Sequence, residues 1–84
     1  MIRILYFAHL RETLGSDGEQ LRPPPAVATV ADLIEHLCGR GGVWARALGP
    51  GERLMVAVNQ ELARPETPIR DTDEVALFPP VTGG

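Results

Sequence analysis

The opening stretch MIRILYFA, residues 1–8, decides the fold because it predicts a strand that is apolar on both faces. Side chains alternate between the two faces of a strand. One face therefore carries three apolar side chains and the other carries two: Ile2, Ile4 and Tyr6, then Leu5 and Phe7. A strand of this kind is typical of the interior of a sheet. We expect it to form the middle of the sheet.

The rest of the chain predicts further elements, which are separated by glycine, proline and asparagine residues. They are a helical turn at 9–14 ended by Gly15, a weak strand at 19–22, a helix at 30–38, a short helix at 43–48, a strand at 54–58 and a last strand at 74–78. Asn59 and Gln60 predict a tight turn after the 54–58 strand, because asparagine in particular tolerates left-handed backbone conformations.

The helix at 30–38 has the clearest signals. Thr29 and Asp32 predict a near capping box, in which the threonine hydroxyl accepts an N–H from the first turn. The apolar residues fall at helical spacing on one stripe, which comprises Val30, Leu33, Ile34, Leu37 and Cys38. We therefore expect Cys38 to point inward and to be structural, and Gly39 to end the helix.

The order of elements is strand, weak strand, helix, strand, short strand and strand. The first and last strands are the most apolar, so we expect them side by side in the centre with the 30–38 helix packed across one face. The predicted fold class is α+β, a β-grasp (ubiquitin-like) roll with a mixed sheet of about four to five strands and one main helix. The domain is expected to cover residues 1–78, with an extended tail at 79–84.

Composition excludes several function classes. The chain has 84 residues and a formal net charge of −3, with no basic stripe for nucleic acid. No apolar run reaches the roughly 20 residues of a membrane helix. Cys38 is the single cysteine, which excludes an internal disulfide and suits a reducing cytoplasmic location. No metal site is expected. The glycines of 39–42 lack the spacing and the lysine of a phosphate loop, so a helix end and a joint explain them better.

The final stretch, FPPVTGG at 78–84, predicts a slender arm. Pro79 and Pro80 fix their own φ angles and stiffen its root. Gly83 and Gly84 carry no side chain, so a narrow channel can admit the end. A carboxylate is a poor electrophile, but a partner enzyme could convert it with ATP to an acyl adenylate that a sulfur or amine nucleophile attacks. The alternative interpretation is an ordinary frayed chain end.

Three stretches carry a family resemblance over essentially the whole length. YFAHLRETLG at 6–15, LMVAVNQEL at 54–62 and DTDEVALFPPVTGG at 71–84 resemble the small-subunit family of molybdopterin synthase, a group of ubiquitin-like sulfur carriers. The terminal Gly-Gly is shared with the thiamin-pathway sulfur carrier and with ubiquitin-like modifiers, whereas FPPVTGG is much narrower.

The resemblance implies a sulfur carrier and not an enzyme on its own. In the family, the C-terminal glycine, matched by Gly84, is adenylated by an E1-like enzyme that uses ATP and is then converted to a thiocarboxylate. That group supplies sulfur to cyclic pyranopterin monophosphate, and two transfers form the molybdopterin dithiolene. The implied partners are the large synthase subunit, as two small plus two large subunits, and a sulfur donor such as a cysteine desulfurase or a rhodanese. Catalytic side chains belong to the large subunit, and no bound cofactor is implied.

The resemblance also implies a partner-binding set around the tail, which comprises Phe7, Arg11, Leu62, Phe78, Pro79, Pro80, Val81 and Thr82. From the residues themselves, Phe7 and Phe78 could meet on the face opposite the helix, although core packing explains Phe7 equally well. Leu62 lies beside a turn and is expected to be exposed. A solvated surface charge is the simpler interpretation of Arg11. Thr72 replaces a glycine that is frequent in the family, so it would be strained if that turn required a positive φ.

Two other function classes stay open. The chain could be a protein modifier whose Gly84 forms an isopeptide bond with a lysine, because the same activated glycine serves both chemistries. It could also be an interaction domain with no chemistry at its C-terminus. His9 and His36 form no recognisable constellation with other residues and are expected to be solvated.

Overall fold

A computed structural model describes residues 1–80, so the predictions for Val81 to Gly84 lie outside the described residues. The elements follow the predicted order. They are β1 (Ile2–Tyr6), α1 (His9–Leu14), β2 (Gly18–Leu21), α2 (Val30–Cys38), α3 (Val43–Leu48), β3 (Met55–Val58), β4 (Glu61–Leu62) and β5 (Glu74–Phe78).

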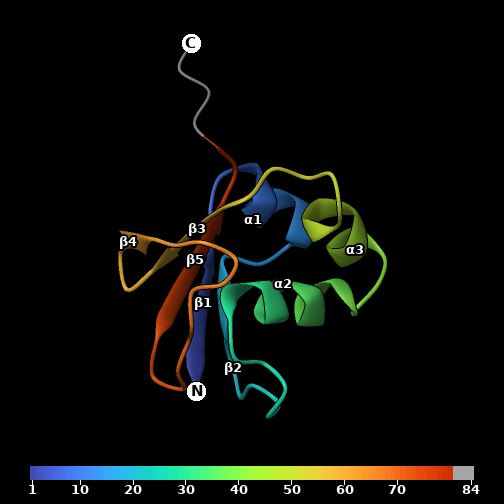
Figure 1. Cartoon of the computed structure of the whole chain (residues 1–84). Helices are drawn as coiled ribbons and strands as arrows, with labels where there is room; N and C mark the ends of the chain where they lie inside the picture. Colours follow the sequence, from blue (N-terminus) through green and yellow to red (C-terminus); the bar gives the residue numbers. More distant parts are fainter. Residues whose placement is uncertain (81–84) are drawn as a thin grey trace.

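The strands form one mixed sheet in the order β2-β1-β5-β3-β4 (Figure 1). β1 and β5 pair in parallel, whereas β2 pairs with β1, and β3 with β5 and β4, in antiparallel fashion. The predicted α+β roll with a mixed sheet is therefore confirmed. The middle strand is β5, with β1 directly beside it, so the first strand is interior but not central.

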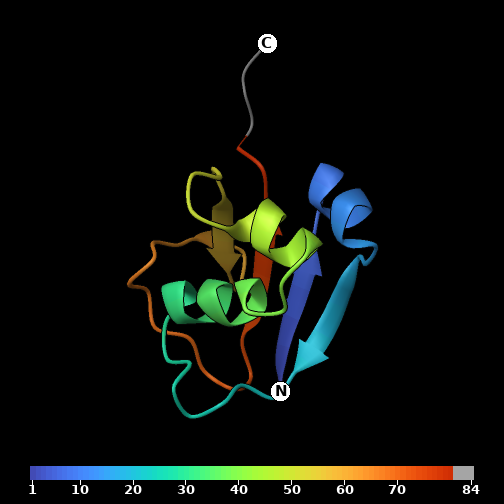
Figure 2. The ribbon, with the colours of Figure 1, turned by 90° about the vertical axis from the view of Figure 1, so that its right-hand side faces the viewer.

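The helices cover one face of this sheet, and α2 and α3 lie in front of the strands in Figure 2. Between the two layers lies a single apolar core, to which the strands contribute Ile2, Ile4, Tyr6, Val56, Val75 and Leu77, and the helices contribute Leu10, Leu14, Val30, Leu33, Leu37 and Leu48. Burial of apolar side chains such as these supplies most of the stability of a small domain.

The start of α2 shows the predicted capping box. The Asp32 N–H donates to Thr29 Oγ1 at 3.2 Å, and the Thr29 N–H donates back to Asp32 Oδ2 at 3.1 Å. The Ala28 N–H donates to the same carboxylate oxygen at 3.0 Å, and this contact is the main reason that the pKa of Asp32 lies below its ordinary value. At the other end, Gly39 follows the last residue of the helix, as predicted.

The first strand is shorter and more one-sided than predicted. It ends at Tyr6, because Ala8 adopts φ 55° and ψ −138°, a region that strongly favours glycine and that turns the chain into α1. Leu5 is only half-buried and Phe7 is exposed. Both faces of the strand are apolar, as predicted, but only the inner face is buried, because no helix of residues 1–80 covers the outer face of the sheet.

Two turns near the end of the chain are linked by hydrogen bonds. Asn59 and Gln60 have φ values of 51° and 70°, which confirms the predicted left-handed turn between β3 and β4. The Asn59 amide donates to Asp73 Oδ1 at 3.0 Å and accepts from the Glu74 N–H at 3.0 Å. Thr72 in the second turn has no positive φ, so the threonine is not strained there.

A polar and aromatic cluster links β1 and β2 to the helical layer, through Arg40 after α2 and Trp44 on α3. The Tyr6 hydroxyl donates to Glu19 Oε2 at 2.8 Å, and the Arg40 guanidinium donates to both Glu19 oxygens at 2.8 and 2.7 Å. Arg40 also lies 4.4 Å from the centre of the Trp44 ring, and Tyr6 packs edge-on against that ring. Burial raises the pKa of Tyr6, while the hydrogen bonds from Arg40 hold the pKa of Glu19 below its ordinary value.

Glu19→Gln is expected to lower the free energy of unfolding at pH 7 by about 1–2 kcal/mol, because a half-buried, charge-assisted pair is lost. The folded-state pKa of Glu19 is depressed, so its contribution is present above the ordinary value of 4.5 and is lost as the pH falls below it. The gap between wild type and variant should therefore close on acidification. Urea unfolding at pH 7 and pH 3 would measure it. Glu12→Gln, at an exposed position on α1, is the matched control, and an equal effect there would contradict the assignment.

Candidate functional site

The uncovered face of the sheet carries Arg3 and Glu74 at one end and is apolar toward the ends of β1 and β5. Successive residues of a strand point to opposite faces, so the register fixes which side chains share this outer face. Leu5 is paired with Ala76, Ala76 with Ala57, Ala57 with Leu62, and Met55 with Phe78. We call this surface the open apolar face, and it comprises Leu5, Phe7, Met55, Ala57, Leu62, Ala76 and Phe78.

Two large side chains of the open apolar face are accessible to a partner. Leu62 is 70% exposed on β4, as predicted, and Phe7 is 45% exposed just after β1. Phe78 is half-buried on β5, the strand next to β1. Phe7 is therefore not part of the core, which removes the alternative interpretation. Exposed apolar side chains that gather on one surface are typical of an interaction site.

The root of the tail lies at one edge of this face. Because β1 and β5 run in parallel, both strands end at the same side of the molecule, and the Phe7 N–H donates to the Leu77 carbonyl at 3.1 Å. Pro79 and Pro80 follow directly and are half-buried. The structure thus brings Phe7, Phe78 and the two prolines together. Their roles in binding stay predictions.

The other predicted site residues do not join this group or lie beyond it. Arg11 is exposed on α1, which agrees with a solvated charge and leaves its predicted role in binding a prediction. Val81, Thr82, Gly83 and Gly84 lie outside the described residues. The proposed chemistry of Gly84 therefore rests on the sequence alone.

Sequence reasoning missed four members of the open apolar face, namely Leu5, Met55, Ala57 and Ala76. Each lies at an alternate position of a strand, so period-two spacing was the available signal. That signal does not say which face is covered by helices. The parallel and antiparallel registers supplied the missing information.

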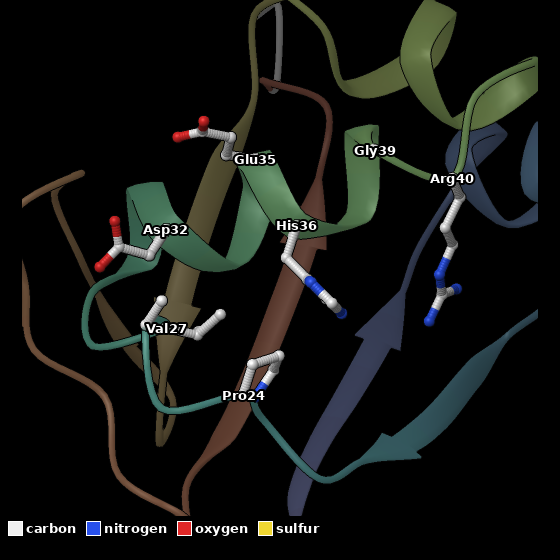
Figure 3. Close-up of a pocket in the computed structure, with 8 residues that line it drawn as sticks. Pro24, Val27, Asp32, Glu35, His36, Gly39 and Arg40 are labelled. Carbon is white, nitrogen blue, oxygen red and sulfur yellow. The ribbon is translucent and has the colours of Figure 1, made fainter.

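A second surface feature, on the helix side, is an open hollow of about 540 Å³ between α2 and the 24–27 loop. Figure 3 shows His36 and Arg40 directed toward the side of α2 where β1 and β2 lie, while Asp32 and Glu35 point away from them. Arg40 is already bound to Glu19, and Asp32 caps its own helix. The hollow therefore offers no convergent set of free polar groups.

Within residues 1–80, no group of three or more histidine, cysteine, aspartate or glutamate side chains is arranged to hold a metal ion. His9 is exposed, and His36 is half-buried at the rim of the hollow. In the same part of the chain, no helix has both the length and the apolar character that crossing a membrane requires.

Comparison with known proteins fixes the family. The sequence profile of the ThiS family matches residues 4–84. The chain belongs to the ThiS family. Relatives of this chain include proteins named molybdopterin synthase sulfur carrier subunit, from Haemophilus influenzae at 45% identity and from Escherichia coli at 44%, each over 100% of both chains. The resemblance inferred from the quoted stretches is therefore confirmed.

A solved structure agrees with the architecture. The crystal structure of small archaeal modifier protein 1 from Haloferax volcanii superimposes with a TM-score of 0.76 at 33% identity, covering 95% of this chain and 97% of that one. The ubiquitin-like β-grasp fold is thus confirmed. The name of that protein agrees with the alternative interpretation of a protein modifier, which stays open.

Cys38 is half-buried and packs against the core, so it points inward less completely than predicted. Partial burial, with a smaller effect from the charge of Glu35, raises the pKa of its thiol and disfavours the reactive thiolate. Cys38→Ala should therefore cost about 1 kcal/mol or less of stability through a small cavity. Thermal unfolding would measure the loss, and Cys38→Ser is the matched variant of similar size. Loss of sulfur transfer in a fully stable Cys38→Ala protein would show instead that the thiol takes part in the chemistry.

Proposed function

We propose that the chain is the sulfur carrier subunit of molybdopterin synthase and that the carboxyl group of Gly84 carries the sulfur. The observation that supports this most strongly is the end-to-end similarity to relatives that bear that name. The geometry adds an exposed apolar face beside the root of the Gly-Gly tail, which suits a protein that presents its terminus to partners. The proposal places its action in molybdenum cofactor biosynthesis.

The chemistry follows from the properties of a carboxylate. An oxygen of Gly84 attacks the α-phosphorus of ATP in an E1-like enzyme, and pyrophosphate leaves. The outer sulfur of a persulfide on the donor then attacks the glycyl carbonyl and AMP leaves, which gives an acyl disulfide. A thiol cleaves this disulfide and is oxidised to a disulfide with the donor cysteine, so that sulfur is left in place of one carboxylate oxygen. The absence of a side chain at Gly83 and Gly84 gives this nucleophile an unhindered approach. The sulfur donor is a protein such as a cysteine desulfurase or a rhodanese.

Delivery takes place in a complex with the large synthase subunit, as two small plus two large subunits. The thiocarboxylate sulfur passes to cyclic pyranopterin monophosphate, and Gly84 returns to a carboxylate with an oxygen from water. Two such transfers make the dithiolene. Catalytic side chains come from the large subunit, and ATP is consumed by the activating enzyme without being retained by this chain.

A second candidate function is protein modification. It is favoured by the similarity to small archaeal modifier protein 1, at 33% identity. An amine in place of the sulfur nucleophile would give an isopeptide bond from the same acyl adenylate. Intact-mass measurement of the protein from its native cells separates the two: a carrier gains the difference between a sulfur and an oxygen atom, whereas a modifier gains the mass of another protein.

The position of the terminal carbonyl provides a direct test. Deleting Gly84 leaves a glycyl carboxylate of identical chemistry at Gly83, set back by about 3.3 Å. Since a misplacement of about 1 Å can reduce a rate on the order of a hundredfold, the variant should fold and bind yet fail to form or deliver a thiocarboxylate. Adding one residue after Gly84 should fail as well. Adenylation and sulfur transfer in a reconstituted system would be measured, and near-normal activity of both variants would refute the carrier proposal.

Leu62→Glu tests the open apolar face. An apolar anchor buried at an interface is worth about 2 kcal/mol, so the variant should bind the large subunit roughly 30-fold more weakly. Leu62 is 70% exposed, so the fold should be unaffected. Gln60→Glu adds the same charge in the same hairpin and is the matched control. Equal affinities for the two variants, measured by calorimetry, would remove Leu62 from the interface.

A further inference from the structure

The side of the tail root away from the open apolar face is hollowed. One hollow, of about 570 Å³, lies between α1, α3, the 51–54 segment and the tail root, and its lining residues are His9, Leu10, Ala47, Gly51, Glu52, Arg53, Leu54, Pro79 and Pro80. A second hollow shares His9, Leu10, Ala47 and Glu52 with the first and adds Thr13 and Arg46. Because these residues are shared, the two form one groove, which we call the tail-root groove.

The rim of the tail-root groove is more basic than the chain as a whole. Its lining contains two arginines, Arg46 and Arg53, and a single carboxylate, Glu52, although the complete chain has a net charge of −3. Among residues 1–80, the ion pairs are Met1 with Asp71 and Arg40 with Glu19. Arg46 and Arg53 thus have no carboxylate within ion-pair distance in the described part of the chain. Both are exposed, and their guanidinium groups are available to a partner.

The tail-root groove lies where a partner that binds the tail would contact these charges. Pro79 and Pro80 line it on one side, and the open apolar face begins at Phe78 on the other. A partner that receives the tail in a channel must surround the root of the tail, so it contacts both sides of that root. The floor of the groove is apolar at Leu10, Ala47 and Leu54, which lowers the local dielectric and strengthens a rim ion pair.

We propose that the tail-root groove is the second half of the docking surface and that Arg46 and Arg53 bind carboxylate side chains of the large subunit. This inference rests on the proposed function. Arginine presents a planar fork of donors that matches a carboxylate, which suits a fixed orientation of the tail. Charges at the rim of an interface act mainly on the association rate and on its salt dependence. The open apolar face supplies affinity, and the groove supplies orientation and steering.

Charge reversal tests the proposal. Arg53→Glu, and Arg46→Glu in parallel, should each weaken binding of the large subunit by roughly tenfold at low salt, mostly through slower association, and the effect should shrink as salt rises. Arg22→Glu, at an exposed position beyond β2, makes the same charge change away from the groove and should leave binding nearly unchanged. Surface plasmon resonance at two ionic strengths measures both rates, and circular dichroism checks the fold. Arg53→Lys should recover most of the steering.

The outcomes separate the groove from the proposed function. If Leu62→Glu weakens binding while Arg46→Glu and Arg53→Glu behave like Arg22→Glu, the groove proposal is overturned and the carrier function stands. A raised KM for ATP in adenylation, with unchanged affinity for the large subunit, would overturn it too and assign the arginines to nucleotide phosphates. If the wild-type chain neither binds the large subunit nor becomes adenylated, the proposed function itself fails.

Discussion

The parallel pairing of β1 with β5 is the interaction on which the rest of the structure depends. It joins the first and last strands, so it closes the domain on itself, and it places Ile4 beside Val75 and Tyr6 beside Leu77 in the core. Because parallel strands end at the same side of a sheet, it also sets the start of α1 and the root of the tail next to each other. The candidate site is a consequence of this pairing.

Because the helices cover only one side of the sheet, the two sides of the same strands have different surroundings. The inner side chains of β1 and β5 are packed under the helices, whereas the outer ones, with those of β3 and β4, form the open apolar face. A domain of this size holds one core, so the second face of the sheet stays exposed, and an exposed apolar face is typical of an interaction site. Stability thus resides on one side of these strands, and the recognition that we propose would use the other side.

The charged groups are divided in a similar way. Arg40 is held by Glu19 on β2 and by the Trp44 ring, and these contacts stabilise the fold. Arg46 and Arg53 have no such carboxylate within residues 1–80 and lie beside the tail root. The same residue type therefore stabilises the fold at one place, while at the other its guanidinium groups are available for the recognition that we propose. The difference is that Arg40 has a carboxylate on β2 within reach.

The sequence by itself determined the element order, the Thr29–Asp32 capping box, the Asn59-Gln60 turn and the β-grasp class, because these depend on local periodicity and on contacts a few residues apart. It also determined the family, through stretches that include FPPVTGG. Only the tertiary structure decided that Phe7 is exposed, that Ala8 ends the first strand, and that Met55 and Ala76 join Leu62 on one face. Strand register and helix cover are long-range properties, so a pattern of apolar residues cannot say which of two apolar faces is left open.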